Sequence, residues 1–140
     1  MEEEFHKIKR VIDANLNRTK EGLRVLEEIS RFILDDKQTT QRIKQIRSDV
    51  GLKAKELDFV AFRESAGDVG RKLFSKGEAQ RSTIKDIAIA NAKRTEESLR
   101  VLEEFLKIIK PDMSKFFKDL RYETYEIEKI LLEKIDEKQH

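Results

Sequence analysis

The chain has 140 residues and 41% of them are charged, yet 30 Lys and Arg nearly balance 28 Asp and Glu, for a formal net charge of +2. This balance argues against a dedicated nucleic-acid-binding protein, which normally concentrates an excess of positive charge. The absence of cysteine excludes thiol chemistry and disulfides, and His6 and His140 lie so near the termini that a zinc site is not expected.

Two helices are predicted in the first half of the chain. The first should run from about Glu3 to Leu34, and the second, capped by Thr39 or Thr40, should end near Asp58. Gly51 falls inside the second helix, where glycine costs about 1 kcal/mol relative to alanine. We expect a close helix crossing to explain this glycine.

The second half of the chain predicts a similar pair of helices. A structured central loop over residues 59–81 is followed by a third helix, which Ser82 or Thr83 caps. This helix stops before Pro111, because proline disfavours helical geometry in the preceding residue. The fourth helix should run over about residues 112–134. The sequence therefore predicts an all-α fold, and its length predicts a single helical domain over residues 1–140.

One helical segment is written twice. "ANLNRTKEGLRVLEE" at residues 14–28 recurs as "ANAKRTEESLRVLEE" at residues 90–104, with eleven of fifteen positions identical and a constant offset of 76. Each copy begins a helical hairpin, over about residues 3–58 and 82–135. Two hairpins related by a pseudo-twofold axis would form a four-helix bundle.

The flanks of the repeat carry less information. "IKQIRSDV" after the first copy corresponds loosely to "FKDLRYET" after the second, which places Arg47 opposite Arg121. The shared text "LRVLEE" is typical of a solvated helix face. We therefore expect Arg24, Glu27 and Arg31 to point outward. Arg24 should pair with Glu28, and Glu27 with Arg31, in ion pairs four residues apart.

A polar set recurs inside each copy. On a helical wheel, Arg18 and Asn15 fall within a stripe of small and apolar residues, as do Arg94 and Asn91, and Gly22 leaves space beside Arg18. An arginine that faces inward needs partners, because burying a lone charge is costly.

Two interpretations of this set stay open. In the structural one, Arg18 and Arg94 pair with Glu21 and Glu97 and lock the hairpins together. In the functional one, two Asn/Arg/Glu sets face each other across the pseudo-twofold axis and line one polar cavity. Arginine is suited to phosphate, and asparagine could recognise a heterocycle or a ribose.

The central loop carries "FRESAGDVGRKLFSKGEAQRST" over residues 62–83. Gly67 and Gly70 allow turns that expose backbone N–H groups to an anion. Asp68 could ligate Mg²⁺ bound to phosphates, or it could cap its own backbone. Neither GxxxxGK[ST] nor GxGxxG is present, so any nucleotide would be bound without the common phosphate loops.

Three motifs in order resemble a small all-helical family of thiamin biosynthesis: "IDANLNRTKEGLRVLEEISRF", "FRESAGDVG" and "IANAKRTEESLRVLEEF". The resemblance covers about residues 8–125. The loop from Arg63 to Gly70 is similar to the family pattern Arg-Asp/Glu-x-x-x-Asp-Val-Gly. Family members occur alone or fused to the N-terminus of thiamine-phosphate synthase, and the family is associated with hydroxymethylpyrimidine phosphate kinase activity. No synthase region is present here, which would imply the stand-alone form.

The resemblance implies transfer of the ATP γ-phosphoryl group onto the phosphate of 4-amino-5-hydroxymethyl-2-methylpyrimidine phosphate, with Mg²⁺ as cofactor. The expected catalytic residues are Arg18, Arg63, Arg94 and Asp68, with Asp68 also the metal ligand. The expected substrate-binding residues are Asn15, Asn91, Glu21, Glu97, Arg47 and Gly70.

Three rival functions remain. The chain could be a non-catalytic helical partner of thiamine-phosphate synthase, or another helical enzyme with an arginine-lined pocket for a polyanion, in the manner of chorismate mutases. It could also be a purely structural bundle with buried Arg–Glu pairs. With no signal peptide and no apolar run of membrane-spanning length, we expect a cytoplasmic protein with no nucleic-acid or membrane partner. A homodimer through an exposed apolar face is possible.

Overall fold

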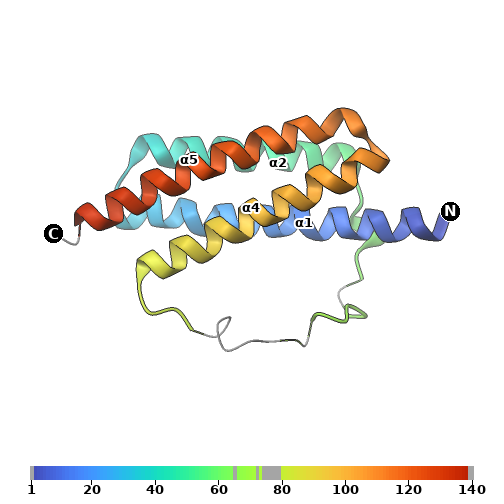
Figure 1. Ribbon diagram of the computed structural model, residues 1–140, viewed down its shortest axis with the longest axis horizontal. Helices are drawn as coiled ribbons and strands as arrows, with labels where there is room; N and C mark the ends of the chain where they lie inside the picture. Colours follow the sequence, from blue (N-terminus) through green and yellow to red (C-terminus); the bar gives the residue numbers. More distant parts are fainter. Residues whose placement is uncertain (1, 65, 72, 74–79, 139–140) are drawn as a thin grey trace.

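The computed structural model describes residues 2–64, 66–71, 73 and 80–138, and its regular structure in these ranges is helical throughout (Figure 1). The four long helices are α1 (Glu2–Glu28), α2 (Lys37–Leu57), α4 (Ile84–Ile109) and α5 (Ser114–Lys138). A π-helical turn (Ile29–Ile33) follows α1, and 3-10 turns follow α2 (Val60–Phe62) and precede α5 (Pro111–Met113). The predicted all-α bundle is confirmed.

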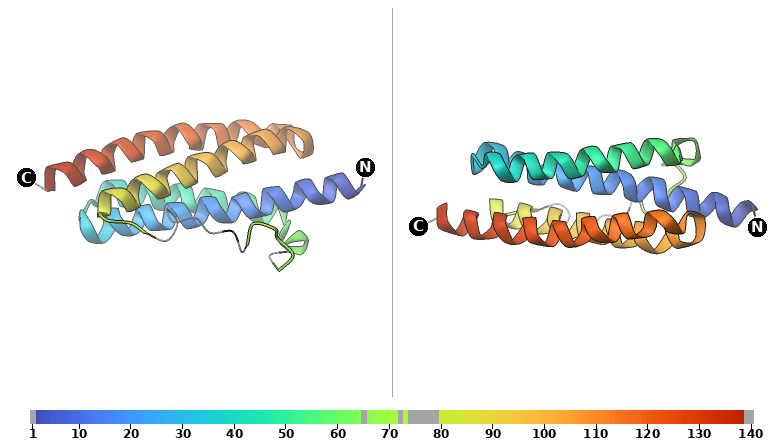
Figure 2. Two further views of the ribbon diagram at one scale, coloured as in Figure 1. Left: turned by 60° about the horizontal axis from the view of Figure 1, so that its bottom comes forward. Right: turned by 90° about the horizontal axis from the view of Figure 1, so that it is seen from above.

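The helices form two hairpins, α1 with α2 and α4 with α5, which Figure 2 shows as two layers packed against each other. The first described residues after α2, including the 3-10 turn, lie beside the N-terminal part of α1 (Figure 1). None of these helices, over the residues described, combines the length and the apolar character that crossing a membrane requires.

The crossing of α1 and α4 displays the pseudo-twofold symmetry of the repeat. Thr19 Oγ1 lies 2.6 Å from Ser98 Oγ, and a Cβ added to Gly22 would lie 2.2 Å from Thr95 Oγ1. Thr95 and Ser98 are the residues 76 positions after Thr19 and Gly22, so the repeat exchanges the two contacts. The axis therefore passes between the antiparallel helices at this point.

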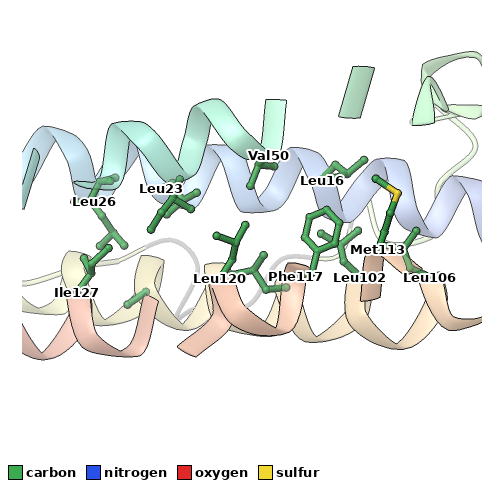
Figure 3. Close-up of a cluster of buried hydrophobic side chains, with 14 of the residues drawn as sticks. Leu16, Leu23, Leu26, Val50, Leu102, Leu106, Met113, Phe117, Leu120 and Ile127 are labelled. Carbon is green, nitrogen blue, oxygen red and sulfur yellow. The ribbon is translucent and has the colours of Figure 1, made fainter. Parts of the chain in front are cut away.

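The core lies between the two layers. Figure 3 shows Leu16, Leu23 and Leu26 of α1 facing Phe117 and Ile127 of α5 across this space. These side chains are at most 3% exposed. Each buried leucine or phenylalanine contributes about 1.5–3 kcal/mol relative to an exposed one, so the interlayer contact holds the hairpins together.

Matching ion pairs join the two helices of each hairpin. Arg47 on α2 lies 3.1 Å from Glu27 on α1, and Arg121 on α5 lies 3.1 Å from Glu103 on α4. Glu27 and Glu103 are 76 positions apart, which confirms the correspondence of Arg47 with Arg121. The prediction that Glu27 points outward is wrong: it is 2% exposed, and Arg47 compensates its charge.

Several predicted helix details needed correction. Asp36 caps α2 by accepting a hydrogen bond from the Thr39 N–H, so neither following threonine is the cap. The predicted cap at Thr83 is confirmed. A Cβ on Gly51 would meet no atom within 4 Å, so a close crossing there is wrong, and Gly22 occupies the close crossing instead.

Candidate functional site

An open cavity of about 490 Å³ lies between α1 and the first part of the central segment. The lining residues are Lys7, Arg10, Val11, Asp13, Ala14, Asn15, Asn17 and Arg18 from α1, and Arg63, Glu64 and Asp68 from the central segment. Figure 1 shows this segment returning to the N-terminal half of α1 after α2 ends. Four of the residues predicted from the sequence, Asn15, Arg18, Arg63 and Asp68, therefore meet at one cavity.

Arg63 is held by a two-point contact with Asp13. Its Nε donates to Asp13 Oδ2 at 2.8 Å, and its Nη2 donates to Asp13 Oδ1 at 3.0 Å. These hydrogen bonds raise the pKa of Arg63, and burial opposes them. Asp13 is 4% exposed, so both of its oxygens are used within the protein. Nη1 of Arg63 has no partner among the described residues.

Arg18 and Asn15 form the other side of the cavity. Asn15 Nδ2 donates to the Val11 carbonyl at 2.8 Å, and its Oδ1 accepts a weak hydrogen bond from Arg18 Nη1 at 3.5 Å. Asn15 is buried, whereas Arg18 is exposed. Arg18 forms no ion pair with any described carboxylate, so its charge is available to a ligand.

The prediction that Arg18 faces inward is wrong. The core face of α1 is formed by Ile12, Leu16, Leu23 and Leu26, on the side of the helix away from Arg18. The wheel was misleading because it counted small residues such as Ala14 and Gly22 as core. Those residues instead border the cavity or the crossing with α4.

Asp68 was predicted either to bind a metal or to cap its own backbone. Its Oδ1 accepts a hydrogen bond from the Gly70 N–H at 2.9 Å, so backbone capping is observed. This N–H is therefore already used and is not presented to an anion, as had been expected for Gly70. The second oxygen of Asp68 has no described partner and stays available at the cavity.

The second Asn/Arg/Glu set is placed elsewhere. Asn91 Nδ2 donates to the Ile87 carbonyl at 2.9 Å, as its counterpart does in α1. Arg94 lies 3.8 Å from Glu21 across the helix crossing, while Glu97 forms no ion pair within the described part of the chain. None of these residues lines the cavity. The prediction that the two sets share one cavity is therefore wrong for the described residues.

The antiparallel crossing explains why the sets are separated. Asn15 precedes the crossing in α1, and Asn91 precedes it in α4. Because the helices run in opposite directions, the two asparagines lie on opposite sides of the crossing between Thr19 and Ser98. Arg47, also predicted to bind substrate, lies on α2 with Glu27 and does not line the cavity.

The buried carboxyl group of Glu96 on α4 lies near the half-buried Glu128 on α5. Lys93 Nζ lies 3.2 Å from Glu96 Oε1 and 3.3 Å from Glu128 Oε1. Burial, followed by the neighbouring Glu128, raises the pKa of Glu96 to about 8. Glu96 is 3% exposed, and its Oε2 has no partner that donates a hydrogen bond.

Sequence reasoning missed Asp13, Arg10 and Glu96. A signal for all three was present in the repeat: the equivalent positions 76 residues away hold Ile89, Asp86 and Lys20, so these are places where the copies differ in charge. A charge that is lost or reversed in the other copy cannot serve the shared helix crossing, and it therefore points to a local role.

Comparison with known proteins identifies several thiamine-phosphate synthases as similar. The chain is 40% identical over 123 residues to the enzyme of Nostoc punctiforme, covering 88% of this chain and 35% of that one. It is 42% identical over 125 residues to that of Synechocystis sp., covering 89% and 36%. It is 34% identical over 125 residues to that of Rhodopirellula baltica, covering 87% and 33%.

The chain thus spans about a third of the length of these curated relatives. No solved structure matches it. The model of the ThiD2 family matches residues 10–130, a range that includes both copies of the repeat and the whole cavity lining except Lys7. The chain belongs to the ThiD2 family.

Proposed function

We propose that this protein acts in thiamin biosynthesis and transfers the γ-phosphoryl group of ATP to 4-amino-5-hydroxymethyl-2-methylpyrimidine phosphate. The observation that carries the proposal is the cavity where Arg18, which lacks a carboxylate partner, faces Arg63 and Asp68 of the central segment. Membership of the ThiD2 family and the relatives named thiamine-phosphate synthase support the pathway.

The charges around the cavity suit a phosphorylated ligand. Four cationic side chains line it against three carboxylates, and Asp13 already neutralises Arg63. The remaining surplus is centred on Arg18, whose planar guanidinium can donate two hydrogen bonds to a phosphate. Phosphoryl transfer depends mainly on positioning and charge neutralisation, and the acceptor phosphate is already ionised. No strong general base is therefore required.

Asn15 is the residue best placed to recognise the aminopyrimidine. One of its Nδ2 hydrogens is used by the Val11 carbonyl, which fixes the orientation of the amide. The other hydrogen and Oδ1 offer a donor and an acceptor side by side, which match a ring nitrogen and its neighbouring amino group. Asn91, Arg94, Glu21, Glu97 and Arg47 lie outside the cavity, so this proposal gives them no contact with substrate there.

Mg²⁺ would enter this cavity with the nucleotide. The carboxylates of Asp68 and Glu64 both line the cavity and are exposed, so either can reach a metal that phosphates also hold. No group of three or more potential metal ligands occurs in the described residues. That fits magnesium, which usually takes one or two carboxylates plus substrate phosphates. The bound ion would supply charge neutralisation at the phosphates.

ADP production by the purified protein tests the proposal. The assay contains Mg-ATP and hydroxymethylpyrimidine phosphate, with one control lacking the pyrimidine and one lacking magnesium. We expect turnover that requires both components. A folded protein that produces no ADP under any of these conditions would refute the kinase activity.

A second candidate function is a non-catalytic partner of thiamine-phosphate synthase. It is favoured by the coverage of the relatives, in which the region similar to this chain is only about a third of a protein named as the synthase. A stable complex with a separately expressed synthase in size-exclusion chromatography, without ATP turnover by this chain, would support the partner function instead.

A further inference from the structure

Three consecutive residues after α2 contact α1. The Phe62 ring packs edge-on against His6, with ring centroids 4.8 Å apart, and lies beneath the Lys9 ammonium at 5.0 Å. Arg63 makes its two-point contact with Asp13. We call residues 62–64 the docking segment.

Glu64 completes the docking segment. Arg10 donates to the Glu64 carbonyl at 3.4 Å and lies 3.8 Å from the Glu64 carboxylate. These are long, exposed contacts, and exposed ion pairs contribute little. Of the polar contacts of the docking segment, only the one with Asp13 combines a buried carboxylate with two short, parallel hydrogen bonds. Asp13 is therefore its main polar anchor.

The second copy of the repeat lacks this anchor. The residues of α4 equivalent to Arg10 and Asp13 are Asp86 and Ile89, which could not hold Glu64 and Arg63. The docking segment thus has a polar partner on α1 alone. This asymmetry places the loop motif beside Arg18 of the first copy and not beside Arg94 of the second.

The contact also leaves Arg63 oriented for a ligand. Asp13 occupies the Nε and Nη2 edge of the guanidinium, which fixes its plane, and Nη1 remains without a described partner at the cavity. A side chain fixed before the ligand arrives loses little conformational entropy on binding. Arg63 can therefore offer one directed hydrogen bond to a phosphate oxygen without rearrangement.

We propose that Asp13 is a positioning residue: by binding Arg63 it holds the docking segment, and the loop motif that follows it, against the phosphate-binding side of the cavity. This inference rests on the proposed kinase function. Asp13 itself does not touch substrate and acts through Arg63.

Two readouts test the role of Asp13, and one of them does not need activity. Trypsin cleaves after Arg63, and the contact with Asp13 should protect this bond in the folded protein. In Asp13→Asn we expect cleavage after residue 63 to accelerate about tenfold under native conditions. We also expect kcat to fall on the order of 10²-fold, since small misplacement of a catalytic group has effects of that size. KM for ATP should change less than kcat.

Glu103→Gln is the matched control. Glu103 is a similarly buried carboxylate that binds an arginine, Arg121, but it lies on α4 away from the cavity. Its loss should lower thermal stability as much as the loss of Asp13, without changing kcat or cleavage after Arg63. Arg63→Lys guards against misfolding of Asp13→Asn, because it keeps the charge and the trypsin site but cannot form the two-point contact. It should reproduce both effects.

The outcomes separate this inference from the proposed function. If the wild type produces no ADP, the proposed function fails, and with it the role of Asp13 in that reaction. Cleavage after residue 63 that stays slow in both Asp13→Asn and Arg63→Lys overturns the positioning role whether or not the wild type is active. Full kcat in folded Asp13→Asn likewise overturns it. Partial recovery of kcat in Asp13→Glu, which restores a carboxylate, supports it.

Discussion

The two copies of the repeated helix are nearly identical in sequence, yet they are used differently. In α1, Arg18 is exposed at a cavity and has no carboxylate partner in the described part of the molecule. In α4, the equivalent Arg94 lies outside the cavity and makes a long, exposed ion pair with Glu21 at 3.8 Å. The same residue in the same local sequence thus lines the cavity in one copy and lies outside it, beside the neighbouring helix, in the other.

This difference shows what the repeat itself is for. The positions that the two copies share build the crossing, where Thr19 meets Ser98 and Gly22 meets Thr95. The positions where the copies differ, such as Asp13 and Ile89, decide which helix receives the central segment. Symmetry therefore accounts for the assembly of the bundle, and its loss accounts for the position of the cavity beside α1.

Replacing Arg18 and Arg94 separately is the most direct test of the difference between the two copies. Under the kinase proposal, Arg18→Ala should lower kcat on the order of 10²-fold or more, because it removes a donor aimed at developing charge. Arg94→Ala should lower kcat less than about tenfold, since that side chain lies outside the cavity. The measurement is steady-state ADP production by the two variants, with circular dichroism to confirm folding.

Equal losses of kcat in the two variants would contradict this assignment and support one site that contains both arginines. Arg24→Ala provides the control on the same helix. Arg24 is exposed and pairs with Glu28 at 3.1 Å, away from the cavity, so its removal should leave kcat unchanged.

Gly22 and Gly51 test whether the α1–α4 crossing is packed more tightly than the rest of the bundle. Gly22→Ala should destabilise the protein by about 1–3 kcal/mol, because the new Cβ overlaps Thr95 Oγ1 and approaches the Asn91 carbonyl at 3.1 Å. Gly51→Ala should stabilise it by about 0.5–1 kcal/mol, since its Cβ meets nothing within 4 Å and alanine favours the helix.

Urea unfolding of both glycine variants measures these opposite signs. Each variant adds one methyl group inside a helix, so they control for each other. Stabilisation by Gly22→Ala would show that the α1–α4 crossing can relax and does not require a glycine at that position.

The fold could be predicted from the sequence because its determinants are local and repeated. Helical spacing, the cap at Thr83 and the 76-residue offset together specify two hairpins. The resemblance to the family implied that Asn15 and Arg18 act together with Arg63 and Asp68, and these four residues line one cavity, but it implied the same for Asn91 and Arg94, which lie outside that cavity.

The features that could not be predicted arise from contacts between residues that are far apart in the sequence. Asp13 lies beside Ile12 on α1 and resembles any solvent-facing acid until Arg63, 50 residues later, folds back onto it. The separation of Asn15 from Asn91 depends on the direction in which α4 crosses α1. A helical wheel gives the angle of a residue around its own helix but carries no information about either event.

The buried carboxyl of Glu96 belongs to a site that exists only in the second copy. In the unfolded chain Glu96 releases its proton near its ordinary pKa of 4.5, but in the folded protein burial raises the pKa to about 8. Between these values the folded state holds more protons, so stability should decrease as the pH rises and become constant above pH 8.

Glu96→Gln should abolish this pH dependence, because the amide resembles the protonated carboxyl and cannot ionise. We expect the variant to be more stable than the wild type at pH 9 by about 1–2 kcal/mol, with a smaller difference at pH 5. Urea unfolding at pH 5, 7 and 9 measures the pH dependence, and Glu97→Gln, which changes the next, exposed residue and keeps Glu96, should retain the pH dependence of the wild type. A stability difference between the variant and the wild type that stays constant across this pH range would mean that Glu96 is already ionised beside Lys93 and that no proton is bound to it between α4 and α5.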